Sequence, residues 1–212
     1  MLDIIISSML FFKTIYIYIV YCYNLFIIII WRKDNMIKIL VVVDEQNDFT
    51  TGSLGNKECA ETIPNVVNVI NSDTYDAIYV TRDTHQIDYL STNEGKHLPV
   101  VHCIENTYGW MICNDVFKAL VGKPFEMVNK TTFGSIYLAS KIREEYFIEQ
   151  EDVEITICGV CTDICVISNA LLLKAYMPEA TIRVVEKACA GVTPESHNKA
   201  IDVMKMCQID II

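Results

Sequence analysis

The sequence predicts an α/β protein with a three-layer αβα architecture, in which helices cover both faces of a doubly wound, mostly parallel sheet. First, short apolar runs rich in Val and Ile alternate with helix-like segments from Met36 to the C-terminus, as in parallel sheets buried on both faces. Second, 52% of the residues are hydrophobic, which is enough for a substantial core. Third, no repeat or low-complexity linker divides this stretch. We therefore expect one domain over residues 36–212.

The expected strands are short runs of apolar, mostly β-branched residues. They are Ile37–Val43, Ala77–Thr81, Phe125–Val128, Val153–Cys158, Thr181–Val185 and Gln208–Ile211. The expected helices repeat apolar residues at helical spacing, near Ala60–Asn71, Ser135–Glu145, Asp163–Ala175 and Pro194–Met206. Thr193 can cap the last helix, and Pro194 suits its first position. Ala200, Ile201 and Met204 share one face of that helix.

Residues 1–35 differ in character from the rest. An uncharged stretch of 18 residues lies between Lys13 and Arg32, which is at the lower limit for spanning a bilayer. A true membrane anchor would leave the following domain in the cytoplasm, because Arg32, Lys33 and Lys38 come after the stretch. Alternatively, translation starts at Met36, directly before the first strand, and the domain is an untethered cytoplasmic protein. A membrane partner is expected only if residues 1–35 are translated.

Charge and cysteine content exclude several classes of function. The formal net charge is −10 and is spread along the chain, so we expect no nucleic-acid partner. The nine cysteines fit reduced thiols better than a disulfide framework, because their number is odd and the chain can form a core. Cys158, Cys161 and Cys165 could hold a metal or an iron–sulfur cluster, but no fourth cysteine follows at a ferredoxin-like spacing.

Polar residues directly follow several of the expected strands. Asp44, Lys130, and the pair Asp83 and His85 each come after an apolar run. In open α/β sheets, ligands bind beyond the carboxyl ends of the strands, so these side chains are candidates for a common site. Cys165 follows another strand, in the first turn of a helix that Thr162 can cap. The helix dipole and free N–H groups there favour a thiolate and could bind an oxyanion.

Three segments resemble the superfamily of nicotinamidases and isochorismatase-like cysteine hydrolases. They are VVVDEQNDF, which contains Asp44, Gln46, Asn47, Asp48 and Phe49; the run that begins at Lys130; and GVCTDIC, which ends at Cys165. The resemblance extends from about Met36 to the C-terminus and implies the isochorismatase-like hydrolase fold. In the superfamily, the cysteine two residues after Thr-Asp is the nucleophile, which selects Cys165 and not Cys161.

The resemblance also implies a mechanism. Asp44 takes the proton of Cys165, the thiolate attacks an amide carbonyl, and Lys130 stabilises the negative charge. Ammonia leaves, and Asp44 then activates water to hydrolyse the thioester. The N–H groups of Cys161 and Cys165 form the oxyanion hole, and the peptide bond before Cys161 is cis. Phe49 corresponds to an aromatic residue of the substrate pocket.

A metal site is implied by the same resemblance. Asp83, His85, Glu94 and His102 correspond to residues that hold a divalent metal in nicotinamidases, and Glu94 lies nine residues after His85. Zn²⁺ is the first choice, although Fe²⁺ or Mn²⁺ would accept these ligands. His97 is a weaker candidate ligand, and His197 is expected to be structural. The aromatic residue usual before the metal histidine is replaced by residues 98–101, for which Tyr108 or Trp110 could compensate.

The resulting hypothesis is a nicotinamidase, which converts nicotinamide to nicotinate and ammonia. Its expected partner is a small-molecule amide. The sequence does not decide whether the protein forms a homo-oligomer. One alternative is another hydrolase of the superfamily, acting on a different small amide, a carbamoyl compound or a vinyl ether. Another is a non-enzymatic redox protein that uses Cys158 and Cys161. The redox alternative is weaker because Cys158 should lie in a strand, whereas a redox CxxC usually begins a helix.

Overall fold

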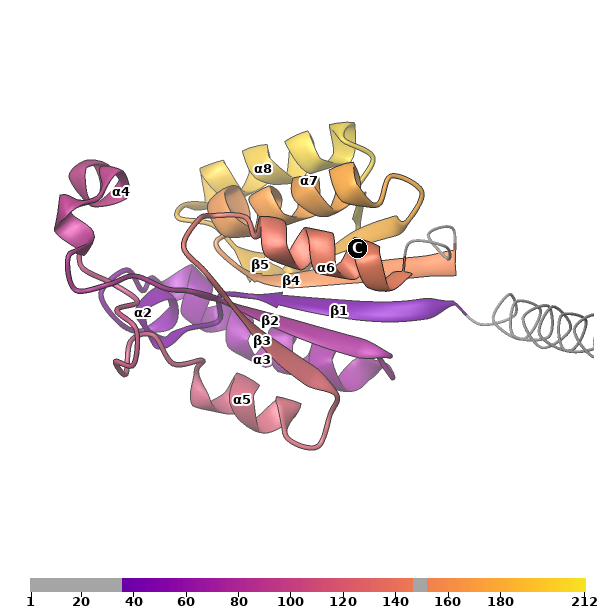
Figure 1. The fold of residues 1–212 in the computed structure, drawn as a ribbon, viewed down its shortest axis with the longest axis horizontal. Helices are drawn as coiled ribbons and strands as arrows, with labels where there is room; N and C mark the ends of the chain where they lie inside the picture. Colours follow the sequence, from indigo (N-terminus) through magenta and orange to yellow (C-terminus); the bar gives the residue numbers. More distant parts are fainter. Residues whose placement is uncertain (1–35, 147–151) are drawn as a thin grey trace, which may run out of the picture. The chain divides into compact units, whose positions relative to one another are not determined.

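A six-stranded sheet forms the centre of the fold (Figure 1). The structure is a computed structural model that describes residues 36–146 and 152–212. In this part of the chain all strand pairs are parallel, in the order β3-β2-β1-β4-β5-β6, so the sheet is parallel throughout and not just mostly. The strands are β1 (Ile37–Val43), β2 (Ala77–Asp83), β3 (Phe125–Lys130), β4 (Val153–Val160), β5 (Thr181–Ala190) and β6 (Asp210–Ile211).

Helices cover both faces of the sheet, which confirms the three-layer prediction. On one side lie α3 (Lys57–Ser72) and α5 (Asn114–Leu120), and on the other lie α6 (Ile136–Tyr146), α7 (Ile167–Tyr176) and α8 (Pro194–Met206) (Figure 1). Short elements lie near the carboxyl ends of the strands: α2 (Asn47–Thr50), a 3₁₀ turn (Tyr89–Ser91), α4 (Asn93–His97) and a π-helical turn (Thr162–Val166). The sequence did not predict α2, α4 or α5, which are too short for a clear periodicity.

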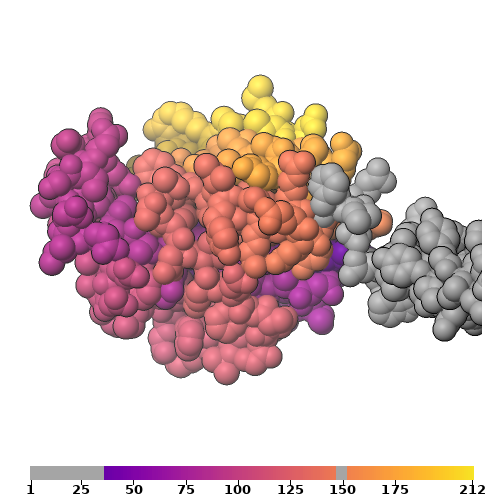
Figure 2. Space-filling view, in the orientation of Figure 1, coloured from indigo at the N-terminus to yellow at the C-terminus, as the bar shows by residue number. Residues whose placement is uncertain are grey.

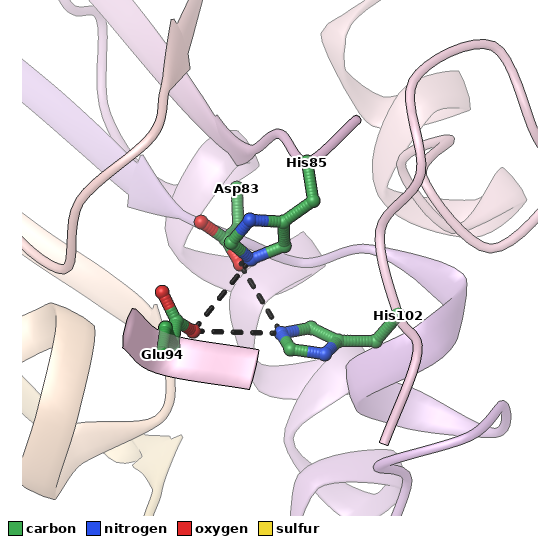
Figure 3. Close-up of side chains that lie close together, drawn as sticks. All are labelled: Asp83, His85, Glu94 and His102. Carbon is green, nitrogen blue, oxygen red and sulfur yellow. Dashed lines mark ion pairs between the residues drawn. The ribbon is translucent and has the colours of Figure 1, made fainter. Parts of the chain in front are cut away.

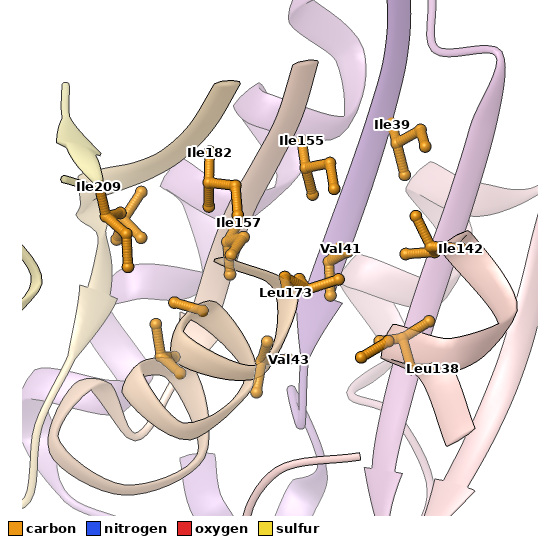
Figure 4. Packing of buried hydrophobic residues seen from close by; sticks show 14 of the residues in the cluster. Ile39, Val41, Val43, Leu138, Ile142, Ile155, Ile157, Leu173, Ile182 and Ile209 are labelled. Carbon is orange, nitrogen blue, oxygen red and sulfur yellow. The ribbon is translucent and has the colours of Figure 1, made fainter. Parts of the chain in front are cut away.

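The core is divided between the two faces of the sheet. Ile39, Val41 and Val43 of β1 belong to the apolar cluster under α6, α7 and α8 (Figure 4). Leu40 and Val42 of the same strand belong to the cluster under α3 and α5. Successive side chains of a strand point to opposite faces, and both faces are buried here. This explains why β1 reads as a continuous apolar run.

Several strands are longer than predicted, because the pairing between neighbouring strands continues past the apolar runs into polar residues. Asp83 is the register partner of Lys130 at the ends of β2 and β3, so two candidate site residues meet as neighbours in the sheet. Gly159 pairs with Val43 and has a φ of 119°. A Cβ there would overlap the backbone of Val43. By contrast, β6 starts two residues later than expected, because Gln208 has a φ of 64° and cannot continue a strand.

The helix boundaries partly match the expectations. The last helix begins at Pro194 as predicted, and Thr193 and Ser196 form a capping box. The first long helix begins earlier than Ala60, at Lys57, because the Asn56 side chain accepts a hydrogen bond from the Cys59 N–H. The helix expected from Asp163 instead begins with the π-helical turn, and α7 continues it.

A long excursion, residues 84–113, connects β2 to α5 and includes the 3₁₀ turn and α4. It projects beyond the carboxyl ends of the strands (Figure 1) and forms the magenta lobe of the surface (Figure 2). Two isolated bridges hold it, His85 with Ile104 and Gln46 with Ile112. No helix in residues 36–146 and 152–212 is long and apolar enough to cross a membrane. The segment 1–35 lies outside the described residues, so both interpretations of it stay predictions.

Candidate active site

Asp44, Lys130 and Cys165 form a buried cluster, called here the nucleophile centre. Asp44 follows β1, Lys130 ends β3, and Cys165 lies in the π-helical turn after β4. Lys130 Nζ is 2.6 Å from Asp44 Oδ2 and 3.5 Å from Cys165 Sγ. Thr81 donates its hydroxyl to Asp44 Oδ1 at 2.7 Å. The sequence therefore placed a carboxylate, an ammonium and a thiol correctly in one cluster.

The backbone at Asp44 is itself unusual. Its φ is 49°, in the left-handed region that non-glycine residues rarely occupy and that is often found at functional sites. The carboxylate is fully buried, and an isolated charge there would be very costly. The Lys130 ammonium and the Thr81 hydroxyl offset that cost. The buried Asp44 carboxylate therefore depends on these two partners.

Burial controls the protonation of this centre. It raises the pKa of the Cys165 thiol well above its usual range, and the Asp44 charge adds to this, while Lys130 opposes it. Burial also raises the pKa of Asp44, against the lowering effect of Lys130. The free thiolate expected from the helix dipole is thus not favoured at rest. The cysteine needs a base beside it, and Asp44 is in a position to be that base.

The turn that holds Cys165 is not capped in the expected way. The turn begins at Thr162 itself, so Cys161 and not Thr162 occupies the N-cap position, without a side-chain cap hydrogen bond. The Thr162 Oγ1 lies 2.9 Å from His197 Nδ1, which supports a structural role for His197. The peptide bond before Cys161 is cis, as the resemblance implied. Both Cys161 and Cys165 line the same cavity, while their role as oxyanion donors stays a prediction.

Asp83, His85, Glu94 and His102 form a second cluster, called here the metal centre (Figure 3). One ligand atom from each residue lies within 4.8 Å of the others. His85 Nε2 is 2.9 Å from Asp83 Oδ2 and 3.6 Å from Glu94 Oε1. His102 Nε2 is 3.5 Å from the same Asp83 oxygen. Ligand atoms around one ion at about 2.1 Å would be separated by roughly 3–4 Å.

The residues of the metal centre fit a divalent cation. His102 Nδ1 lies 2.8 Å from the Val100 carbonyl, which places its proton on Nδ1 and leaves Nε2 free to bind a metal. His85 Nε2 is buried and forms no hydrogen bond within the described residues. Two imidazoles and two carboxylates suit Zn²⁺, Fe²⁺ or Mn²⁺. Among the described residues, ligands of metal-binding type gather only here, so the three-cysteine alternative gains no support.

Two residues of the opening motif hold this centre in place, a role that sequence reasoning missed. Gln46 accepts the Asp83 N–H at 2.7 Å and donates to the Asp83 carbonyl at 2.8 Å. Asp48 accepts the N–H of Cys103, next to His102, at 2.8 Å. The sequence signal that could have indicated this role was the presence of polar residues directly after the apolar run of β1.

A cavity of about 190 Å³ connects the two centres. Phe49 lines it and packs against the His102 ring, with centroids 5.6 Å apart. Neither Tyr108 nor Trp110 lines the cavity: Trp110 donates to Thr84, and Tyr108 is exposed. Phe133 lines it instead, so this residue, and not those suggested from the sequence, supplies the second aromatic wall.

The remaining candidates lie away from the metal centre. The His97 ring bonds to the carbonyl of Asn93 in its own short helix, so it is not brought to the cluster. Cys158 lies inside β4, and burial raises the pKa of its thiol well above the usual range. A redox CxxC formed by Cys158 and Cys161 is therefore disfavoured, since such a pair needs an accessible, acidic thiol.

Comparisons with known proteins show the family of the chain. A family model described as the isochorismatase domain matches residues 38–212. The chain is 25% identical to a nicotinamidase of Saccharomyces cerevisiae over 214 residues, which covers 82% of this chain and 99% of the yeast protein. It is 24% identical to a nicotinamidase of Schizosaccharomyces pombe over 204 residues, with coverages of 82% and 91%.

A solved structure supports the same relationship. The pyrazinamidase of Pyrococcus horikoshii in complex with zinc matches with a TM-score of 0.63 and 26% identity, over 82% of this chain and 98% of that chain. The chain belongs to the isochorismatase domain family, and it is a hydrolase that acts on carbon–nitrogen bonds.

Proposed function

We propose that this hydrolase converts nicotinamide to nicotinate and ammonia through a thioester on Cys165. The observation that carries the proposal is the position of Asp83 between the two centres. Its Oδ1 is 3.5 Å from Lys130 Nζ, and its Oδ2 is 2.9 Å from His85 Nε2. A substrate in the adjoining cavity can thus reach the nucleophile with its amide group and the metal centre with another part of the molecule.

The protein groups divide the reaction into two proton-transfer cycles. Asp44 accepts the Cys165 proton as the sulfur attacks the amide carbon, and it then delivers that proton to the departing nitrogen. A water molecule next loses a proton to Asp44 and attacks the thioester, which releases the acid and restores the thiol. The Lys130 ammonium, 2.6 Å away, favours the ionised form of Asp44 before each transfer, against the effect of burial. The N–H groups of Cys161 and Cys165 would hold the oxyanion.

Asp83, His85, Glu94 and His102 would hold the divalent metal, for which Zn²⁺ is the first choice. When bound, the metal would supply a Lewis acid for a heteroaromatic ring nitrogen. This suits the substrate, because the cavity of about 190 Å³ is lined mainly by apolar side chains and accommodates a single ring. The resemblance of the chain to two nicotinamidases and a pyrazinamidase supports the same substrate class.

A panel of amides tests the proposal through ammonia release. Nicotinamide and pyrazinamide should be hydrolysed, and benzamide is the matched control, since it has the same shape without a ring nitrogen. We expect kcat/KM for benzamide to be at least about 10²-fold lower, the usual scale for losing a strong polar contact. Chelation should remove the activity on nicotinamide. Full activity without metal on a vinyl ether or carbamoyl compound, with none on nicotinamide, would contradict the proposal.

A further inference from the structure

The cavity wall at Phe133 lies in residues 131–135, called here the wall segment, which joins β3 to α6. The Phe133 side chain lines both the substrate cavity of about 190 Å³ and a larger outer cavity of about 850 Å³. Its ring is half-exposed and belongs to none of the apolar clusters of the described residues. The position of the ring therefore depends on how the backbone of the wall segment is fixed.

Asn169 of α7 fixes that backbone. Its side chain is buried, with 1% exposed. Its Oδ1 accepts the Ser135 N–H at 2.9 Å, and its Nδ2 donates to the Phe133 carbonyl at 3.3 Å and to the Cys165 carbonyl at 2.8 Å. The reversed amide would direct an oxygen at two carbonyls, so these partners determine its orientation. One buried side chain thus joins the cavity wall to the backbone of the nucleophile.

The wall segment lies directly against α7. A Cβ on Gly134 would lie 2.6 Å from Leu172 Cδ1 and 3.0 Å from the Ser168 carbonyl oxygen. The Ser135 hydroxyl accepts the Leu138 N–H at 3.1 Å, so the first turn of α6 starts where Asn169 holds the chain. The helices α6 and α7 lie side by side (Figure 1). Asn169 is therefore part of a close contact between two backbones.

The nucleophile centre has supports of its own. Lys130 is the register partner of Asp83 in the sheet, and its carbonyl accepts the Thr84 N–H at 2.8 Å. Cys165 lies in the turn after β4, in which the Val166 N–H donates to the Cys161 carbonyl at 3.1 Å. Loss of the Asn169 amide should thus move the wall segment and leave the nucleophile centre in place.

We propose that Asn169 is a positioning residue for substrate binding, which holds the Phe133 ring at the distance from Cys165 that a single heteroaromatic ring requires. The identity of that ring rests on the proposed function, whereas the geometry does not. The wall contacts a part of the substrate that does not react, so it binds the ground state and the transition state alike. Loss of such uniform binding raises KM and leaves kcat unchanged.

The first test needs no substrate. Hydrogen–deuterium exchange is measured by mass spectrometry on the unchanged, metal-loaded protein and on Asn169→Ala. Peptides that cover residues 131–138 should exchange at least about fivefold faster in the variant, the scale of one lost hydrogen bond. Exchange in α8 and the metal content should stay the same. The matched control is Asn198→Ala, which removes an exposed asparagine from α8. Equal exchange of residues 131–138 in Asn169→Ala and the unchanged protein would overturn the proposal.

The second test measures KM and kcat for nicotinamide. Asn169→Ala should raise KM about tenfold, the scale of a lost apolar contact, and should change kcat less than about threefold. Asn169→Ser is a milder variant, because its hydroxyl can still donate to the Cys165 carbonyl four residues earlier but is too short to hold the wall segment. It should show the same rise in KM with better stability in urea. A normal KM in Asn169→Ser, or a loss confined to kcat, would contradict the positioning role.

A double variant shows whether Asn169 acts through the wall. Phe133→Leu should raise KM by itself, and adding Asn169→Ala should then raise KM less than about threefold further, because both changes remove the same contact. Full multiplication of the two effects would overturn the proposal, since a general loss of stability acts independently of Phe133. If the unchanged protein releases no ammonia from nicotinamide, the proposed function fails, and the exchange test still decides the role of Asn169.

Discussion

The nucleophile centre and the metal centre share a cavity but are built in different ways. Asp44 and Lys130 follow or end strands of the central sheet, and Cys165 lies in the turn directly after β4. The metal centre takes Asp83 from β2, whereas its other three residues come from the excursion of residues 84–113. The side chains of Asp44 and Lys130 are 0% and 1% exposed, while that of Glu94 is 24% exposed.

This difference separates two kinds of dependence. Parallel strands fix the positions of their carboxyl ends, so the nucleophile centre is organised by the same packing that forms the core. The excursion is held by two isolated bridges, by a hydrogen bond that the Gln46 side chain donates to the Trp110 carbonyl, and by one that Asp48 accepts from the Cys103 N–H. A bound metal would be a further link between its segments. Variants in the first centre should thus change chemistry, and variants in the second should change metal affinity.

The largest effect is expected from Cys165→Ala. Turnover should fall by about 10⁴-fold or more, since the nucleophile is lost. The fold and metal content should stay unchanged, because the side chain is small and is not a ligand. Steady-state ammonia release, circular dichroism and metal analysis check the three parts. If Cys161→Ala abolishes turnover and Cys165→Ala does not, the nucleophile has been assigned to the wrong cysteine.

Asp44→Asn and Lys130→Ala should each lower kcat by about 10²-fold or more. Lys130→Ala should also lower the free energy of unfolding by about 3–5 kcal/mol, because it leaves a buried carboxylate without its cation. The double variant Asp44→Asn, Lys130→Ala should regain part of that stability without regaining activity. Urea unfolding and kinetics on all three variants form the test. Mild losses of activity in both single variants would contradict the roles proposed for Asp44 and Lys130.

The contrast between the two centres also explains what the sequence could predict. Asp44, Asp83 and Lys130 could be placed because an apolar run that ends in a polar residue marks the carboxyl end of a buried strand. Glu94 and His102 depended on the family resemblance, since no periodicity determines how an excursion folds back. The cap at Thr162 was wrong because the turn begins one residue earlier than expected, with Cys161 in the cap position, and the Thr162 side chain contacts the distant His197. Phe133 was also missed, because its place in the cavity depends on how the segment after β3 folds, and no local sequence pattern determines this.

The metal centre should respond to the loss of a ligand in proportion to its burial. Outer-shell substitutions usually cost 10–100-fold in metal affinity, so His102→Ala should lower affinity by about 10²-fold or more. Glu94→Gln should cost only about tenfold, because this part-exposed carboxylate comes from the short α4. His97→Ala, in the same helix, is the control and should bind metal normally. Competition with a chelator measures all three, and stoichiometric tight binding by His102→Ala would exclude that ligand.

Glu45→Gln should have the smallest effect on activity. It tests the contrast between two adjacent buried carboxyl groups, those of Asp44 and Glu45. Asp44 has Lys130 and Thr81 as partners, whereas the adjacent Glu45 is equally buried and its Oε2 has no hydrogen-bond partner among the described residues. Its Oε1 has only a long contact of 3.4 Å with the Thr62 hydroxyl. Burial, followed by the charge of Cys59, raises the pKa of Glu45 to about 8 from 4.5.

The sign of the pH effect follows from this shift. Between about pH 4.5 and 8 the folded protein holds a proton on Glu45 that the unfolded chain releases. Raising the pH therefore destabilises the fold through this window and not beyond it. Glu45→Gln removes the ionisable group, so its advantage in unfolding free energy should grow from pH 4.5 to 8 by on the order of a few kcal/mol and then level off. Urea midpoints at several pH values measure this advantage, and Glu179→Gln, at an exposed position, is the control. The value of kcat/KM should change less than about threefold, because Glu45 does not line the cavity. An advantage that stays constant with pH would show that Glu45 is ionised in the fold, and that an interaction comparable to the Asp44–Lys130 pair stabilises it.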